Sequence, residues 1–376
     1  MATTTRALRA QWLRPSLRLP TPTITQATRR CQSTLADLQH SMPLRKIQPI
    51  FDDLSPQTSY RLDMSLADYL PSTNPPSTLP PTSPHTPLPI PHHLIYFEPT
   101  KPASHMLPDG TNPDQSPGEP YTRRMWAGGH VLYNPTNPLT LDGGRGVCAE
   151  FIRSVQAKGK EGEEKLFVRI ERRLARASES EVEGLAAAAR GEEGAREALE
   201  HRVRQRLWRD REGDFGPCSV VETRNIVFLR PRTPAQARED AAKGPGKKLL
   251  PAKQADWEHV VLPDAKLLFR FSALTFNAHA IHLDPEYCRA VEGHRERLFH
   301  GPLSFVFMIT LLQQELRREG LGEVVREVEY RNLAPLYCNE KVKFCGARTG
   351  EGKWEVWTET PEGGVAVKGS VVTERV

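Results

Sequence analysis

The sequence predicts an α+β protein in which an antiparallel sheet wraps around one central helix. Residues 303–319, LSFVFMITLLQQELRRE, have the length of a helix, and the first ten present apolar side chains on every face. A helix that is apolar all round must be enclosed on all sides. Four strand-like segments with turn residues between them follow, at 324–333, 340–349, 353–360 and 364–376. A central helix followed by an antiparallel meander is the order of a hotdog fold.

The bulk composition restricts the classes of function. The chain of 376 residues has room for two or three domains, and its 33 prolines imply long segments outside any core. The net charge of +5 is modest, and no basic, aromatic-interleaved patch or zinc-finger spacing supports nucleic-acid binding. The six cysteines form no C-x-x-C pair, which is typical of reduced thiols. The longest apolar run, 303–312, is about half of a membrane span, so we expect no membrane insertion.

Residues 1–36 are predicted to be a mitochondrial transit peptide. The segment contains six arginines, no lysine and no acidic residue, and it is rich in Ser and Thr. Arg29-Arg30-Cys31 is a candidate processing site. A disordered basic arm is the alternative, whereas a secretory signal is disfavoured because the segment has no apolar core of the required length. We therefore expect the protein in the mitochondrial matrix.

A helical lead-in and a proline-rich loop are predicted for residues 37–91. Fifteen prolines lie between residues 71 and 120, so no regular element can run through that stretch. Residues 92–97, HHLIYF, are predicted to form a strand where the loop ends.

Three further segments predict a sheet in the N-terminal part of the chain. Residues 117–133, 166–174 and 219–230 have strand patterns, and LFVRIERRL (166–174) alternates apolar and charged residues as a half-buried strand does. The Ala-, Glu- and Arg-rich segment 175–213 between the last two is predicted to be a solvated helical insertion.

The densest group of proton-transfer residues lies between 275 and 303. After a predicted strand at 267–276, Asn277, His279 and His282 fall within six residues, and HGP (300–302) directly precedes the apolar helix. Histidine can act as an acid or a base near neutral pH without tuning. Proline suits the first turn of a helix, and glycine lets backbone N–H groups approach a ligand closely. This stretch is the candidate active site.

These residues resemble the MaoC-like, or type 2, enoyl-thioester hydratases and dehydratases. The family signature is close to S/G-D-x-N-P-I-H, followed by H-G-x-L at the start of the central helix. NAHAIH (277–282) falls on the first part and HGPL (300–303) on the second, and 331–344 is similar to a strand of the family. EPYTRRMWAGG (119–129) and EEKLFVRIERR (163–173) are similar to the first, degenerate hotdog of the double-hotdog branch, which includes fungal mitochondrial 3-hydroxyacyl-thioester dehydratases and mesaconyl-C4-CoA hydratases.

The resemblance implies a double hotdog in which each half is an antiparallel sheet wrapped around a central helix. The degenerate N-terminal hotdog would span 92–230, a linker 231–260, and the catalytic C-terminal hotdog 261–376. Because one hotdog normally pairs with another and this chain supplies both, the protein is expected to be a monomeric pseudo-dimer or a homodimer. The reaction moves protons and no electrons, so we expect neither a metal nor another cofactor.

The resemblance also suggests roles for the site residues. His282 is expected to be the acid/base that handles the α-proton and the leaving water. The backbone N–H at Gly301, flanked by His300 and Pro302, is expected to bind the thioester oxygen, and such donors lower a barrier by ~2.7–4 kcal/mol. Asn277 replaces the usual aspartate of the family and is expected to position the water or hold the imidazole. His279 replaces the usual asparagine and is expected to be a second proton donor or an orienting group.

Each of these assignments has a structural alternative. His282 could be a core histidine with satisfied hydrogen bonds, and His279 could face away from the site. His279, His282, Asp284 and His300 match no recognised metal-ligand spacing, so no metal site is predicted. Asp284 is interpreted as a turn or a helix cap rather than as the missing carboxylate. Three residues, Arg123, Arg124 and Trp126, could line the path of a phosphopantetheine arm or could serve ordinary packing.

The leading hypothesis is a hydro-lyase that dehydrates (3R)-3-hydroxyacyl thioesters of the acyl carrier protein in mitochondrial fatty acid synthesis. The nearest rival is a hydratase of CoA esters such as mesaconyl-C4-CoA, which the motif does not separate from the first. A non-catalytic subunit that binds acyl thioesters is a third hypothesis, prompted by the replaced aspartate.

Overall fold

A computed structural model describes residues 34–71, 75–244, 246 and 248–375 of the chain. The predicted transit peptide lies outside the described residues, apart from 34–36. From Thr34 onwards the chain forms one unit. Among the described residues, no helix is both long enough and apolar enough to cross a membrane.

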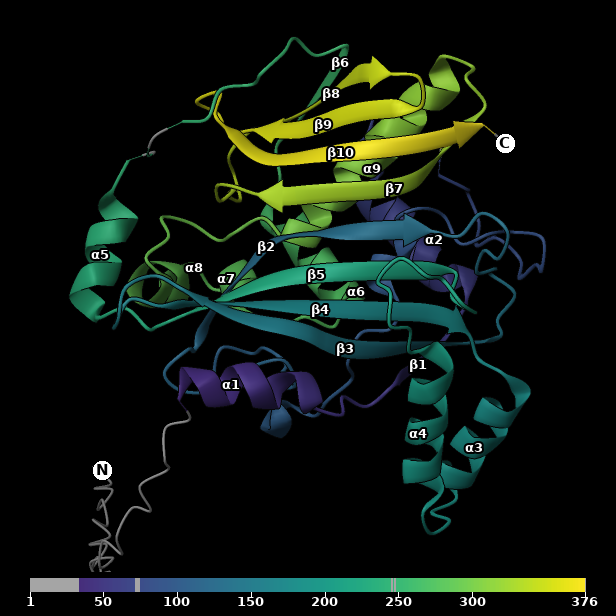
Figure 1. Cartoon of the computed structure of the whole chain (residues 1–376). Coiled ribbons are helices and arrows are strands. Elements are labelled where there is room, and N and C mark those ends of the chain that lie inside the picture. Colours follow the sequence, from purple (N-terminus) through teal and green to yellow (C-terminus); the bar gives the residue numbers. More distant parts are fainter. Residues whose placement is uncertain (1–33, 72–74, 245, 247, 376) are drawn as a thin grey trace, which may run out of the picture. The chain divides into compact units, whose positions relative to one another are not determined.

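A ten-stranded antiparallel sheet is the frame of the described structure (Figure 1). Its strand order is β1-β3-β4-β5-β2-β7-β10-β9-β8-β6. The strands of the N-terminal half, β1–β5, therefore meet those of the C-terminal half, β6–β10, at a seam between β2 and β7, where Gly129 pairs with Tyr330 and Val131 with Val328. The bounds are β1 Ile50–Asp53, β2 Arg123–Tyr133, β3 Arg145–Lys158, β4 Lys165–Arg176, β5 Val220–Leu229, β6 Trp257–Val261, β7 Glu323–Asn332, β8 Val342–Gly350, β9 Lys353–Glu359 and β10 Val365–Arg375.

Helices cover parts of this sheet and carry the connections between its strands. The α-helices are α1 Leu35–Ser41, α2 Pro56–Leu66, α3 Glu179–Ala189, α4 Ala195–Leu207, α5 Pro234–Ala242, α6 Ala265–Leu274, α7 Ala280–Leu283, α8 Pro285–Tyr287 and α9 Gly301–Arg318. Shorter helical turns are η1 Met42–Leu44, η2 His92–Ile95, η3 Ala103–His105 and the π-helical η4 Cys288–Glu292.

The predicted central helix and the four strands after it are confirmed as α9 and β7–β10. α9 begins at Gly301, with Pro302 in its first turn, and lies against the C-terminal half of the sheet (Figure 1). Its side chains are buried almost without interruption from Leu303 to Leu316, because strands and neighbouring helices enclose every face.

An apolar cluster extends from α9 into the N-terminal half. Leu62 and Leu66 of α2 and Leu94 of η2 belong to the same cluster as Phe305 and Phe307 of α9. The two halves of the sheet, with α2 and α9 against them, make the α+β double hotdog that the sequence predicts.

The predicted strands of the N-terminal half form β2, β4 and β5, but β4 is not half-buried as expected. Glu171 and Arg173, which are charged residues of that alternating segment, have no exposed surface. The reason lies in the segment 175–213, whose helix α4 packs Leu199 and Val203 over this face. Oε1 of Glu171 accepts there from Arg153 at 2.7 Å and from Arg173.

Two other predicted strands are helical. Residues 92–97 are all buried, and residues 92–95 form η2. The N–H groups of His92 and Leu94 donate three residues back, to the carbonyls of Pro89 at 2.7 Å and Pro91 at 3.2 Å, instead of to a neighbouring strand. Residues 267–276 fall largely in α6, where the side chain of Asp264 caps the helix by accepting from the N–H of Leu267 at 2.9 Å. The apparent alternation fails at Phe269, which is 65% exposed, whereas Phe271 is 1% exposed.

The segment predicted as a linker, 231–260, contains regular structure. It forms α5 and most of β6, and β6 pairs with β8, so the C-terminal half of the sheet begins at Trp257. The five cysteines that the structure describes are buried free thiols.

Candidate active site

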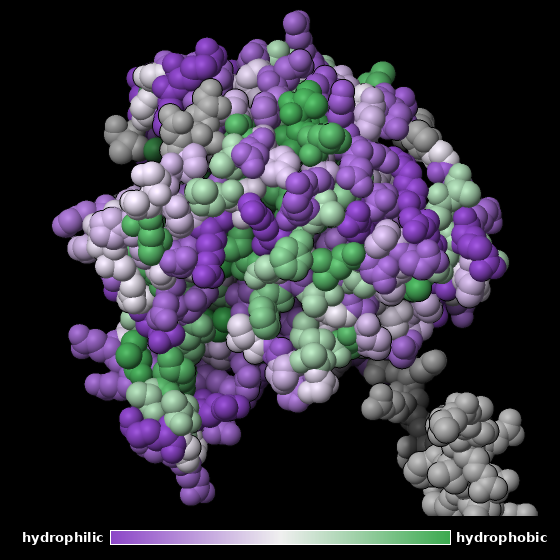
Figure 2. Space-filling model, turned by 180° about the vertical axis from the view of Figure 1, so that it is seen from behind, coloured by the Kyte–Doolittle hydropathy of each residue, from purple (hydrophilic) through white to green (hydrophobic). Residues whose placement is uncertain are grey.

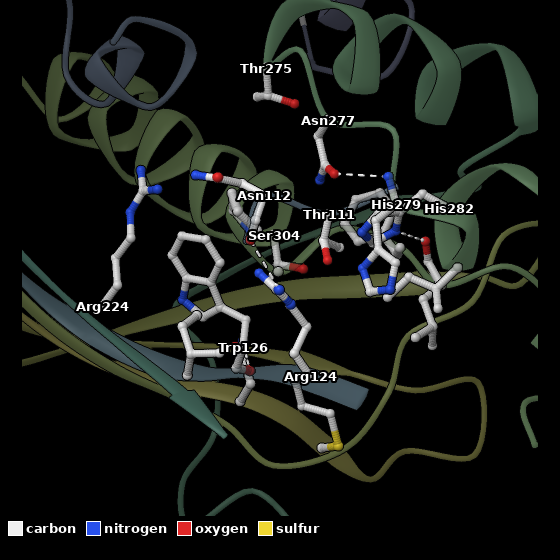
Figure 3. A pocket seen from close by; sticks show the side chains of 18 of the residues that line it. Thr111, Asn112, Arg124, Trp126, Arg224, Thr275, Asn277, His279, His282 and Ser304 are labelled. Atoms are coloured by element: carbon white, nitrogen blue, oxygen red, sulfur yellow. Dashed lines mark hydrogen bonds between the residues drawn. The ribbon is translucent and has the colours of Figure 1, made fainter. Parts of the chain in front are cut away.

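A cavity of about 310 Å³ lies where the two halves of the molecule meet. Figure 3 shows Arg124 and Trp126 on one side of it and His279 and His282 on another. The residues that line it include Thr111, Asn112, Arg124, Trp126, Arg224, Asn277, His279, His282, Gly301 and Pro302.

His282 is held as a neutral base. Its Nδ1 lies 2.8 Å from the carbonyl oxygen of Leu298, and because a carbonyl can only accept, Nδ1 must carry the proton. Nε2 is therefore the unprotonated nitrogen of this imidazole. Burial lowers the pKa of His282 to about 4, despite the opposing effect of the Leu298 carbonyl, so the ring is neutral at pH 7. A neutral, oriented imidazole on a cavity wall can take a proton from a substrate.

The ring of His300 packs against the ring of His282. The two rings stack at a centroid distance of 3.6 Å and an angle of 19°. Nε2 of His300 lies 2.9 Å from the hydroxyl of Ser272, and the residue is 1% exposed. Burial, with smaller contributions from His282 and His279, lowers the pKa of His300 well below its usual value. His300 is thus a buried neighbour of His282, and it is not among the residues that line the cavity.

Asn277 and His279 lie in the turn that joins α6 to α7. The backbone adopts a left-handed conformation at Phe276, with φ of 47°, and the N–H of Asn277 then donates to the carbonyl of Ser272. Oδ1 of Asn277 accepts from the backbone N–H of His279 at 3.0 Å (Figure 3). Because Oδ1 is engaged in this way, the Nδ2 amide group is the part of Asn277 that remains to donate to a ligand.

The first turn of α9 meets the seam of the sheet. A side chain at Gly301 would place its Cβ 3.0 Å from Nδ2 of Asn332 and 3.4 Å from Trp126, so glycine allows the close approach at this point. The N–H groups of a first helical turn have no partner within the helix and carry a partial positive charge. Gly301 and Pro302 line the cavity, so this helix end remains the candidate site for a developing oxyanion.

The two arginines at the start of β2 have different surroundings. Arg123 forms a buried ion pair with Glu292 at 2.7 Å. Arg124 lines the cavity, donates to the carbonyl of Asn112 at 3.1 Å and lies over the ring of Phe228. Burial lowers the pKa of Arg124 to about 10, although Asp109 acts in the opposite direction. Arg124 is therefore a buried cation near the histidines.

Functional candidates that the sequence did not reveal come from the proline-rich segment before β2. The loop 107–112 brings Asp109, Thr111 and Asn112 to the cavity region, and Nε2 of His279 lies 3.5 Å from Oδ2 of Asp109. In the sequence these residues lie in the proline-rich stretch, for which only the absence of a continuous regular element is predicted. No local pattern could relate them to a histidine in the other half of the chain.

Asp284 is a helix cap, as predicted. Its side chain accepts from the N–H groups of Glu286 and Tyr287, at 2.8 and 3.1 Å, and starts α8. In the described ranges, no three His, Cys, Asp or Glu side chains are grouped so that they could hold a metal ion.

Exposed apolar side chains surround the mouth of the cavity. Met125, Phe276 and Leu333 line it and are 50%, 56% and 48% exposed. The face turned away from the viewer in Figure 1 is largely hydrophilic and carries several hydrophobic patches (Figure 2). An apolar rim of this kind suits a ligand with a flexible, partly apolar arm.

Comparisons with known proteins match most of the described chain. The family model of hydroxyacyl-thioester dehydratase type 2 matches residues 91–195 and 187–338. Mesaconyl-C(4)-CoA hydratase of Chloroflexus aurantiacus is 27% identical over 290 residues, which are 76% of this chain and 84% of that protein. The mitochondrial hydroxyacyl-thioester dehydratase type 2 of Schizosaccharomyces pombe is 26% identical over 131 residues, 35% of this chain and 40% of that protein. A MaoC-like dehydratase structure from Phytophthora capsici has a TM-score of 0.49 and 13% identity, and the match covers 87% of this chain and 95% of that one.

The family match defines the class of the protein as a hydro-lyase that acts on thioesters. Within that class, the chain belongs to the hydroxyacyl-thioester dehydratase type 2 family. This membership counts against the hypothesis of a non-catalytic binding subunit.

Proposed function

We propose that the protein catalyses the reversible dehydration of (3R)-3-hydroxyacyl thioesters to trans-2-enoyl thioesters in mitochondria. The observation that carries this proposal is the neutral imidazole of His282. Its Nδ1–H is fixed on the Leu298 carbonyl, and the residue lines a cavity that also contains the first turn of α9.

The reaction needs a base for the C2 proton and donors for the carbonyl oxygen. Nε2 of His282 takes the C2 proton, and the negative charge that develops on the thioester oxygen is stabilised by the N–H of Gly301. The C2–C3 double bond forms while the C3–O bond breaks, and the hydroxyl takes up a proton and leaves as water. Hydration follows the same steps in reverse.

Asn277 and His279 bind the hydroxyl in this scheme. With Oδ1 of Asn277 engaged by the backbone N–H of His279, Nδ2 can donate to the oxygen of the substrate hydroxyl or of the attacking water. His279 lines the same cavity, next to His282, at a ring-centroid distance of 5.8 Å.

The proposal also includes the compartment in which the protein acts and the carrier to which the acyl group is attached. The arginine-rich, acid-free segment 1–36 supports import into mitochondria, and two yeast relatives carry that location in their names. Both points favour the acyl carrier protein of mitochondrial fatty acid synthesis as the source of the thioester. The apolar rim of the cavity is compatible with a phosphopantetheine arm, which the carrier protein shares with CoA.

A second candidate is the hydration of CoA esters with a charged acyl group, such as mesaconyl-C4-CoA. The bacterial hydratase of that name aligns over 76% of the chain, more than either yeast relative. Arg124 and Arg224 on the cavity wall offer cationic partners for a substrate carboxylate.

Hydration of crotonyl-CoA by the full-length protein tests the proposal. The wild type should hydrate this substrate, and His282→Ala should lower kcat by ~10³-fold or more, because the variant lacks the base while the helix end remains. His201→Ala removes an exposed histidine of α4 and serves as the matched control, with wild-type activity expected. Activity of His282→Ala within threefold of the wild type would contradict the assignment.

The same assay separates the two candidates. Crotonyl thioesters of acyl carrier protein and of CoA should both react, and the first should have the higher kcat/KM if the carrier protein is the natural substrate. A preference for mesaconyl-C4-CoA over both would favour the second candidate.

A further inference from the structure

We propose that Asp109 is the carboxylate of this active site, and that it positions His279 as a second acid/base group beside His282. This inference rests on the proposed dehydratase function. It gives a function to the loop before β2, and it supplies from the N-terminal half the negative charge that Asn277 does not provide.

The loop holds the carboxylate of Asp109 in one orientation. Oδ1 accepts two hydrogen bonds from Thr111, one from its N–H at 2.9 Å and one from its hydroxyl at 2.6 Å. The N–H of Gly110 donates to the carbonyl of Leu107 at 2.8 Å and closes the turn. With Oδ1 occupied, the free oxygen is Oδ2.

The loop is also docked on the turn that carries His279. The carbonyl of Asp109 accepts from the N–H of Ala280 at 2.9 Å, at the start of α7. A Cβ on Gly110 would lie 2.1 Å from the carbonyl oxygen of Ala278, which shows how closely the two backbones approach. Gly110 has φ of 81°, a conformation that favours glycine. Asp109 and His279 are therefore held at a fixed separation.

One atom of each side chain faces the other residue without a hydrogen-bond partner. Oδ2 of Asp109 and Nε2 of His279 are both buried, neither has a hydrogen bond, and they lie 3.5 Å apart. Buried polar atoms that remain unpaired cost free energy, and such groups gather at functional sites. A separation of 3.5 Å is longer than a good hydrogen bond, and catalytic contacts of this kind commonly tighten when substrate binds.

The charges around this pair indicate why the carboxylate is needed. His279 faces His282 of α7, His300 at the start of α9 and Arg124 of β2, while Tyr287 of α8 faces Asp109. Burial, then His282 and Arg124, lower the pKa of His279 well below its usual value. Among the groups of the described chain that face His279, Asp109 is the one with a negative charge. It favours the protonated ring, as the aspartate of a catalytic triad does.

When the two imidazoles together carry one extra proton, one ring can act as the base and the other as the acid. In dehydration, the C2–H bond breaks and its proton passes to Nε2 of His282, while the C3 hydroxyl takes a proton from Nδ1 of the His279 imidazolium and leaves as water. His279 ends neutral, with Nε2–H directed to Asp109, and His282 ends protonated. Proton exchange with solvent restores the pair. Hydration needs the mirror state, so both directions require one proton on the two rings.

The pH profile of Asp109→Asn tests this role. The amide keeps an oxygen for Thr111 and removes the charge, so the one-proton state should form only at lower pH. We expect kcat for crotonyl-CoA hydration by the full-length protein at pH 7.5 to fall by ~10²–10³-fold, within the range of general acid–base effects. The alkaline limb of the profile should move at least one pH unit downwards, with KM within threefold of the wild type.

Two further variants make the result specific. Asp114→Asn is the matched control, because Asp114 lies in the same segment and pairs with Lys101 at 3.1 Å, away from His279. It should keep the wild-type profile. His279→Gln should lose as much activity as Asp109→Asn, and the double variant should lose little more, because both changes interrupt one pair.

The outcomes are distinguishable from a failure of the proposed function. A wild-type alkaline limb in Asp109→Asn, or a loss expressed in KM and thermal stability alone, would overturn the role of Asp109. If Asp109→Asn does not fold, His279→Gln decides, and a wild-type profile for it overturns the proposal. The dehydratase function is tested separately by His282→Ala, and that test does not depend on the result for Asp109→Asn.

Discussion

The two halves of the sheet bury different kinds of side chain. In the N-terminal half, Arg172 has no exposed surface, and it lies 2.9 Å from Glu150, 3.0 Å from Glu222 and 2.6 Å from the carbonyl of Phe97. In the C-terminal half, the buried face of α9 is apolar apart from Ser304 and Glu315. The N-terminal half thus combines apolar clusters with a buried network of paired charges, whereas the core around α9 is almost wholly apolar.

The two halves also contribute different kinds of residue to the cavity. The apolar C-terminal half orients His282 and the end of α9 on rigid helices. The charged N-terminal half lines the opposite wall, where Glu150, Arg124 and Arg224 reach the cavity. Buried ion pairs contribute little net stability, but losing one partner is costly. The charged half should therefore be the more sensitive to a single substitution of a charged residue.

Arg172→Met should give the largest effect on folding, because it removes one buried cationic partner from Glu150, Glu222 and the carbonyl of Phe97 at once. We expect the free energy of unfolding to fall by ~3–5 kcal/mol, measured by urea denaturation. Arg326→Met, which removes an ion pair to the exposed Glu374 in the C-terminal half, is the control and should cost at most ~1 kcal/mol. Equal losses in the two variants would abolish the contrast between the halves.

The pH dependence of this loss has a defined sign. Burial would raise the pKa of Glu222, but Arg224 and Arg172 hold it at about 2. The resulting stabilisation is present above pH 4.5, the ordinary pKa of glutamate, and is lost as the pH falls towards 2. The difference between wild type and Arg172→Met should therefore be largest at neutral pH and narrow in acid.

Gly301→Ala tests the contact between the first turn of α9 and the seam, and it should have an intermediate effect. The added methyl group meets Asn332 and Trp126, so the first turn of α9 must shift by a few tenths of an ångström. We expect kcat to fall about tenfold, or ~1.4 kcal/mol in the barrier, with the fold retained. Gly244→Ala, where a Cβ meets nothing within 4 Å, should be silent. An unchanged kcat in Gly301→Ala would remove this helix end from the oxyanion site.

Asn277→Asp should have the smallest effect, because the carboxylate can still accept from the N–H of His279 and can accept from the substrate hydroxyl in place of the donation by Nδ2. If the N-terminal half already supplies the charge through Asp109, a second carboxylate adds no advantage, and kcat should stay within about fivefold. A large rise would mean that the C-terminal half lacked a charge of its own, and a collapse would mean that the Nδ2 amide is indispensable. Steady-state kinetics with crotonyl-CoA measure all three results.

The sequence predicted best the regions where one local pattern determines the structure. The apolar run of α9 and the alternation in the strands after it predicted the fold of the C-terminal half correctly. The motifs that contain His282 and Gly301 predicted residues that line the cavity. The same rules failed at α6, where the Asp264 cap overrides an apparent alternation, and at Glu171, whose burial depends on a helix inserted after β4. Asp109 could not be related to His279, because their contact depends on how two loops from different halves dock.

Because β2 and β7 pair within one polypeptide, the contact between the two halves of the cavity does not depend on protein concentration. Asp109 lies before the seam in the sequence and His279 after it, so each translated copy carries both parts of the site. Their encounter is a first-order event that follows from folding, and dilution does not separate them, unlike parts contributed by two subunits under mass action. The contact between these two residues therefore does not depend on how many copies of the chain a cell makes.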